Sequence, residues 1–78
     1  MNYVFPQLIK FKKESIAGNG TSIITLDKTP LPGSHGVDIN GSPQVEGVDY
    51  VIAGKDLDFS PATFDGSYRF NNKYAYSG

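Results

Sequence analysis

The chain has 78 residues and a formal net charge of −1, with nine glycines, five prolines and no cysteine. This length fits one small domain, and the missing cysteines exclude a disulfide scaffold and a thiolate metal site. The balanced charge provides no basic surface of the kind that binds nucleic acid. No apolar run is long enough to span a membrane, and we expect no signal peptide from the first residues.

The first segment alternates between apolar and polar side chains, which is the period of a β-strand. One parity holds Tyr3, Phe5, Ile9 and Phe11, and the other holds Lys10 and Lys12. Because Pro6 lacks an N–H donor, we predict an N-terminal arm or edge strand over residues 1–8. A β-sandwich module is then expected over residues 9–71, followed by a C-terminal tail or strand over residues 72–78.

Turn signals divide the rest of the chain into short strands. Asn40-Gly41 predicts a tight hairpin, since both central residues of a type I′ turn need positive φ. Gly54-Lys55 predicts a second two-residue turn, flanked by strands in which Ile52 and Leu57 share a face. We predict a loop that ends at Gly66, and a further turn at Asn71-Asn72. Strands are expected over residues 8–13, 22–26, 37–39, 48–52, 56–60, 67–70 and 74–76.

Composition points to the same class of structure. β-Branched and aromatic residues are common, whereas strong helix formers are few, which favours strands over helices. Short strands separated by regular turn signals are typical of sandwiches and barrels. The sequence therefore predicts an all-β fold, a small antiparallel β-sandwich or barrel of six to seven strands with extended terminal arms.

The order of these signals resembles the repeated β-sandwich modules of bacteriophage tail fibres and other virion appendage or decoration proteins. The resemblance spans roughly residues 15 to 70. The matching residues are Gly20, Thr21, Ile23, Ile24, Pro32, Gly33, Ser34, Val37, Ile39, Asn40, Gly41, Gly47, Asp49, Tyr50, Ile52, Gly54, Leu57, Phe59, Pro61, Ala62, Asp65, Gly66, Tyr68 and Phe70. The chain departs from the pattern at Ser42-Pro43-Gln44, and it reverses the usual order at Pro61-Ala62 and Asp65-Gly66.

The resemblance implies a virion structural protein without chemistry of its own, either a head decoration or a fibre or neck attachment module. It implies assembly in the host bacterial cytoplasm, with capsid, neck or fibre chains as partners, and it allows a homotrimer. Neither nucleic acid nor a membrane is expected as a partner.

Aromatic residues near both ends suggest where such assembly takes place. Tyrosine is common at interfaces because it buries a large area and keeps a polar group. We therefore predict an assembly interface at Tyr3, Phe5, Tyr74 and Tyr76, by addition to a neighbouring strand. The alternative is that both ends pair within the domain itself. The basic cluster around Lys12 is either a solvated strand face or a contact to an acidic partner surface.

Few residues could support catalysis or metal binding. His35 is the only histidine, and it is expected to be exposed in a glycine-rich loop. Asp56 and Asp58 lie on one face of a predicted strand, where the carboxylates are either solvated or contribute to a calcium site. We predict no enzyme activity, no metal and no cofactor. An alternative function is a free-standing carbohydrate- or protein-binding module that uses Phe64 and Tyr68.

Overall fold

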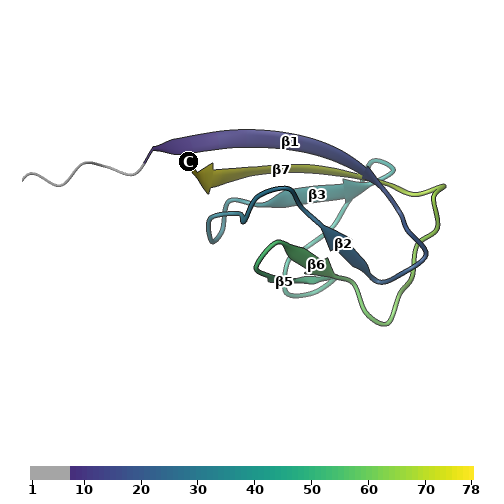
Figure 1. Ribbon diagram of the computed structural model, residues 1–78. Coiled ribbons are helices and arrows are strands. Elements are labelled where there is room, and N and C mark those ends of the chain that lie inside the picture. Colours follow the sequence, from purple (N-terminus) through teal and green to yellow (C-terminus); the bar gives the residue numbers. More distant parts are fainter. Residues whose placement is uncertain (1–7) are drawn as a thin grey trace, which may run out of the picture.

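Residues 8–78 fold into seven β-strands in two antiparallel sheets, which confirms the predicted all-β class (Figure 1). The computed structural model describes residues 8–78, so Tyr3 and Phe5 lie outside the described residues. Strands and loops make up all of residues 8–78, and no helix there could cross a membrane.

The larger sheet has four strands in the order β1-β7-β3-β4. Its long members are β1 (Ile9–Ala17) and β7 (Arg69–Ser77), which pair along their whole length. β3 (Gly36–Ile39) pairs with the other side of β7, and β4 (Ser42–Pro43) completes the sheet. β7 runs through the boundary predicted between residues 71 and 72 and lies inside the sheet between two partners.

The smaller sheet has three strands in the order β2-β6-β5. β2 (Ile23–Thr25) and β5 (Val51–Ala53) flank β6 (Asp56–Asp58), so that Ile24 and Ile52 both lie opposite Leu57. The predicted hairpin between residues 48 and 60 is therefore present.

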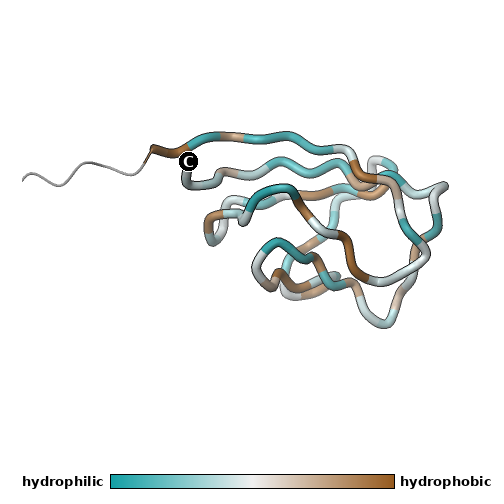
Figure 2. The backbone as a smooth tube through the Cα atoms, viewed as in Figure 1, coloured by the Kyte–Doolittle hydropathy of each residue, from teal (hydrophilic) through white to brown (hydrophobic). Residues whose placement is uncertain are grey.

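The core lies between the two sheets, where hydrophobic residues from both layers meet (Figure 2). Its buried members are Ile24, Leu26, Val37, Ile39, Tyr50, Leu57, Phe59, Phe70 and Tyr74. Aromatic rings connect the layers: the Phe59 ring centroid lies 5.2 Å from that of Phe70 and 5.1 Å from that of Tyr50. Such tilted aromatic pairs add to the free energy gained from burial.

Local turn chemistry fixes the hairpins. Asn40 and Gly41 connect β3 to β4 with φ values of 51° and 89°, as a type I′ turn requires. Gly54, between β5 and β6, has a φ of 63°. Gly66 lies inside a turn that the Tyr68 N–H closes by donating to the Asp65 carbonyl.

The prediction of a turn at Asn71-Asn72 is wrong, because both residues lie within β7. Their side chains are satisfied across the sheet instead of by a local turn. Asn71 accepts a hydrogen bond from Ser15 of β1 and donates one to Asp38 of β3. Asn72 is buried; its amide donates to the Glu14 carbonyl oxygen of β1 and to the Phe70 carbonyl oxygen of its own strand.

Truncation of the core tests this packing. Ile24 is fully buried, so Ile24→Val should lower the free energy of unfolding by about 1 kcal/mol. Ile9→Val is the matched control, because Ile9 is half exposed and should lose much less. Urea unfolding of the two variants measures both values, and equal losses would contradict this position of the core.

The turn between β3 and β4 gives a second test. Gly41→Ala should destabilise the domain by about 1–2 kcal/mol, because a side chain disfavours the φ of 89°. Gly66→Ala is the control, since its φ is not in the left-handed region and the added methyl has room. Thermal unfolding would contradict the type I′ turn if the two variants lost stability equally.

Candidate functional site

β1 leaves one side of its backbone unpaired at the edge of the larger sheet. The Gly78 N–H donates to the Leu8 carbonyl, and the Gly18 N–H donates to the Tyr68 carbonyl, both at 2.9 Å. Because hydrogen-bonded pairs alternate along antiparallel strands, the even-numbered residues of β1 bond β7. The N–H and C=O groups of the odd-numbered residues therefore point away from the sheet. Within residues 8–78, no second strand pairs with this edge.

Hydrophobic side chains are exposed at the same edge. Leu8 is 62% exposed, Ile9 51% and Phe11 82%. Ile9 and Phe11 project from the outer face of the sheet, whereas Ile16, on the opposite parity, packs against the core. The beginning of β1 is accordingly hydrophobic, as its colour in Figure 2 shows, and its hydrophobic side chains are exposed within the described chain. We call Leu8, Ile9, Phe11 and the free backbone edge beside them the β1 edge.

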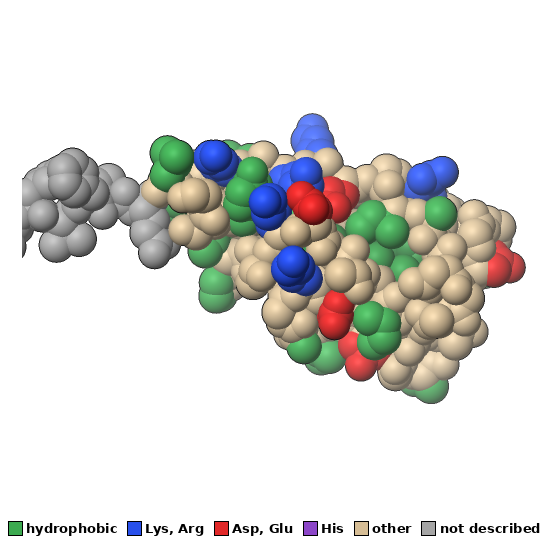
Figure 3. All heavy atoms as spheres, in the orientation of Figure 1, with side chains coloured by type: hydrophobic (Ala, Val, Ile, Leu, Met, Phe, Trp, Pro, Cys, Tyr) green, Lys and Arg blue, Asp and Glu red, His purple; other side chains and the backbone are tan. Residues whose placement is uncertain are grey.

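Positive charge accompanies this hydrophobic segment. Lys10, Lys12 and Lys13 lie within β1, and Lys73 of β7 lies directly opposite Lys13. Several Lys or Arg side chains gather over the β1 and β7 side of the molecule, beside hydrophobic groups (Figure 3). The one ion pair within residues 8–78 joins the Lys12 ammonium to Asp27 at 3.5 Å. The other lysines of β1 therefore remain without a neutralising carboxylate in the described chain.

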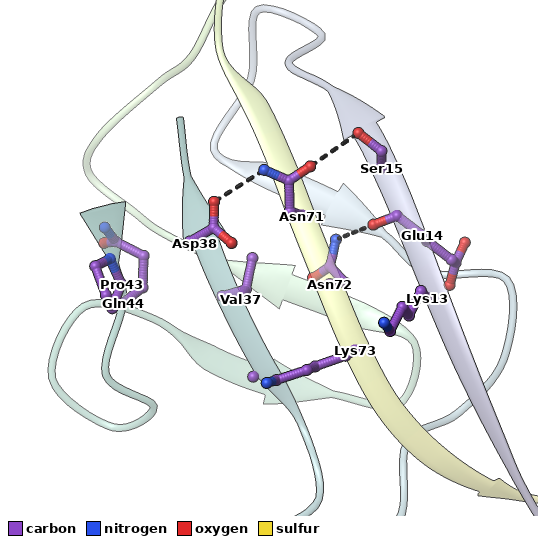
Figure 4. A pocket seen from close by; sticks show the side chains of 11 residues that line it. Lys13, Glu14, Ser15, Val37, Asp38, Pro43, Gln44, Asn71, Asn72 and Lys73 are labelled. Atoms are coloured by element: carbon purple, nitrogen blue, oxygen red, sulfur yellow. Dashed lines mark hydrogen bonds between the residues drawn. The ribbon is translucent and has the colours of Figure 1, made fainter. Parts of the chain in front are cut away.

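Two hollows lie on the larger sheet near these residues. One, of about 480 Å³, is lined by Phe11, Lys12, Lys13, Ser34, Lys73, Tyr74 and Ala75. The other, of about 610 Å³, lies over β7 between β1, β3 and β4 (Figure 4). Among the residues that line it, Ser15 donates a hydrogen bond to Asn71, and Asn71 donates one to Asp38. The hydrogen bonds from Asn71 and the Gly41 N–H lower the pKa of Asp38.

His35 is not the exposed loop residue that the sequence suggested. Its Nδ1 lies 2.9 Å from the Tyr50 hydroxyl, and its Nε2 lies 2.8 Å from Oδ1 of the buried Asn72. The ring also packs edge-on against Tyr50 at 5.6 Å. Because both nitrogens are engaged by neutral groups within the fold, this arrangement connects loop to core and leaves no free base beside a nucleophile.

Tyr74 and Tyr76, predicted as assembly residues, lie in β7 on the face directed toward the core. Tyr74 is buried; its hydroxyl donates to the Glu14 carboxylate and accepts from the Lys28 N–H. Tyr76 is half-buried beneath the Lys28 ammonium, which lies 5.8 Å from its ring centroid. Both side chains are largely used inside the domain, and their role in assembly stays a prediction.

The aspartates serve local structure. Asp56 accepts a hydrogen bond from the Thr25 hydroxyl, and Asp58 accepts one from the Ser60 N–H. Hydrogen bonding by the Ser60 side chain, and to a lesser extent by its N–H, lowers the pKa of Asp58. Asp65 accepts from both the hydroxyl and the N–H of Ser67, and its pKa is lowered in the same way. Across residues 8–78, no three acidic or histidine side chains come together as ligands for a metal ion.

The two aromatic residues proposed for ligand recognition differ in exposure. Phe64 is half-buried and packs edge-on against Phe59 and Phe70 at 5.6 and 5.1 Å. Tyr68 is 39% exposed and packs against the Phe64 ring. Only Tyr68 thus presents much of its ring surface to solvent.

Sequence reasoning did not identify the β1 edge as the most exposed hydrophobic surface near a terminus. A signal was present, because the hydrophobic residues of the first strand change parity between Phe11 and Ile16. Side chains on opposite parities point to opposite faces, so one set had to face away from the core.

The chain matches no known protein-family model, and no curated protein or solved structure shows significant similarity to it. The resemblance to phage appendage modules therefore depends on the ordered sequence signals alone.

Burial of two tyrosines predicts weaker folding at alkaline pH. Burial is the main cause that raises the pKa of Tyr50 and of Tyr74 to about 12, from 10.0. Between these values the native state binds more protons than the unfolded state. The stabilisation is therefore complete below pH 10 and is lost as the pH rises through about 12.

Urea unfolding across the alkaline range measures this loss. Tyr74→Phe should make the decline of stability with pH less steep, because one of the two titrating groups is removed. Profiles of the variant and the parent chain that stay parallel would show that Tyr74 does not contribute.

Proposed function

We propose that the chain is a structural module of a bacteriophage virion, as a head decoration or a fibre or neck attachment module, and acts by protein–protein assembly. The observation that carries the assembly role is the β1 edge, where an unpaired strand backbone lies beside exposed Leu8, Ile9 and Phe11. The virion context is supported by the ordered resemblance over residues 15 to 70.

The mechanism of attachment is addition of a partner strand to β1. Long, exposed hydrophobic edges promote pairing with other chains, and proteins normally cover or shorten them. A partner strand would satisfy the outward backbone groups of Ile9, Phe11 and Lys13 and supply main-chain affinity. Burial of Phe11 alone would contribute about 1.5–3 kcal/mol, and the adjoining hollow provides room for a partner side chain.

A second candidate is the free-standing carbohydrate- or protein-binding module. The groove over β7 favours it, because its polar side chains, Asp38, Asn71 and Gln44 among them, offer both donors and acceptors. The groove does not include Phe64 or Tyr68, so a ligand there would lack the aromatic stacking expected from the sequence.

Virion composition tests the proposal. Particles purified from the phage that encodes the chain should contain it at a fixed copy number, measured by quantitative mass spectrometry. Phe11→Lys should reduce incorporation about tenfold or more, because the charged side chain opposes burial at the interface. Val48→Lys is the matched control, since Val48 is equally exposed, at 80%, and lies outside the β1 edge. Absence of the parent chain from purified particles would overturn the proposal.

A further inference from the structure

We infer that the partner strand at the β1 edge alternates hydrophobic and acidic side chains and comes from a protein other than this chain. This inference rests on the proposed function, since it specifies the chemistry of the partner at the same edge. Three features of β1 carry it: the parity of its hydrophobic residues, the position of its lysines and the charge of a second copy.

The hydrophobic half of the pattern follows from the outer face. Side chains directly opposite on neighbouring strands project from the same face of a sheet and contact each other. Ile9 and Phe11 both project from the outer face and are 51% and 82% exposed. Hydrophobic side chains at every second position of the partner would cover them, and one would enter the hollow beside Phe11 and Ala75.

The acidic half follows from the other face. Lys10 and Lys12 occupy the intervening positions of β1, and so they lie beside the remaining residues of an added strand. Lys10 has no ion-pair partner within residues 8–78, and Lys12 has one exposed partner, Asp27. Carboxylates opposite these two lysines would neutralise them in a partly desolvated site, which is where an ion pair adds selectivity.

Lys13 marks where the alternation ends, because it shares the outer face with Ile9 and Phe11 instead of the face of Lys10 and Lys12. It lies directly opposite Lys73 on β7, and like charges at directly opposed positions destabilise a sheet. A partner carboxylate next to Lys13 would relieve this repulsion. The Gly36 position opposite Lys73 on β3 offers no carboxylate to do so.

Charge also disfavours a second copy of the chain as the partner. A two-fold dimer would pair β1 with β1 in antiparallel orientation. Registers centred on Lys10, Lys12 or Lys13 place each lysine against its own copy, and the register centred on Phe11 places Lys10 against Lys12. The registers that place Phe11 against Ile9 or against a second Phe11 therefore oppose lysine to lysine, whereas the register centred on Ile9 opposes none but leaves Phe11 without an opposite residue in β1. The same side chains that reject a second copy favour an acidic strand.

Short peptides with capped ends provide the probe. One alternates Val and Glu, a second has Lys in place of each Glu, and a third has Thr there. A fourth repeats the Val and Glu peptide with the backbone nitrogen of each Val methylated, which removes the hydrogen-bond donors that would face β1. Titration of each peptide into the full chain, followed through the backbone amide signals of β1 by NMR, gives the four affinities.

The Val and Glu peptide should bind at least about tenfold more tightly than the Thr peptide, and its affinity should fall as salt is added. The Lys peptide and the methylated peptide should not bind measurably. Lys10→Glu should reduce affinity for the Val and Glu peptide about tenfold and improve binding of the Lys peptide. Lys55→Glu is the matched control, because Lys55 is exposed in the turn of the other sheet and should change nothing.

The outcomes separate the inference from the proposed function. Equal affinity for the Thr and Glu peptides would overturn the acidic pattern and leave strand addition in place. Equal binding of the methylated peptide would show that the ligand does not pair with the edge, which overturns both. Failure of every peptide to bind also overturns both. Concentration-dependent dimers in sedimentation, lost in Phe11→Lys, would identify a second copy as the occupant and overturn the inference alone.

Discussion

Pairing of β7 with β1 on one side and with β3 on the other is the interaction on which the rest of the molecule depends. β7 supplies Phe70 and Tyr74 to the core, Asn72 to the His35 contact and Asn71 to the outer face. Its register with β1 directs Ile16 inward and Ile9 and Phe11 outward. The exposed edge thus follows from the same pairing that builds the core, because a strand fixed at one position has fixed faces along its whole length.

The β1 edge combines attraction and selection in a few residues. Hydrophobic side chains and free backbone groups favour any added strand, whereas Lys10, Lys12 and Lys13 discriminate among strands by charge. Edges of natural sheets are commonly protected by lysine, which prevents pairing between identical chains. Here Lys10 and Lys12 alternate with hydrophobic residues that remain exposed. Their charge therefore opposes pairing with a basic strand more than pairing with an acidic one.

The features that could be predicted from sequence alone are those set by residues close together in the chain. The all-β class, the Asn40-Gly41 turn and the hairpin that joins Ile52 to Leu57 follow from local spacing and turn chemistry. Asn71, Asn72 and His35 were misassigned because their side-chain partners lie 15 to 56 residues away along the chain. Ser15 and Asp38 bond Asn71 inside the sheet, and Tyr50 and Asn72 hold His35 against the core. The hydrophobic parity of the first strand was visible, but which parity faces solvent is decided by the register with β7.

The separation along the chain between β1 and β7 has a kinetic consequence. Ile9 lies opposite Ser77, so the larger sheet closes a loop that includes nearly every described residue. Contacts so remote in sequence slow folding, because chain entropy must be lost before the pairing energy is gained. During synthesis on the ribosome, β1 therefore remains unpaired until β7 has emerged. In that interval its hydrophobic residues are available to chaperones or to a partner strand, and binding before the sheet closes would couple maturation of the chain to its incorporation into a larger assembly.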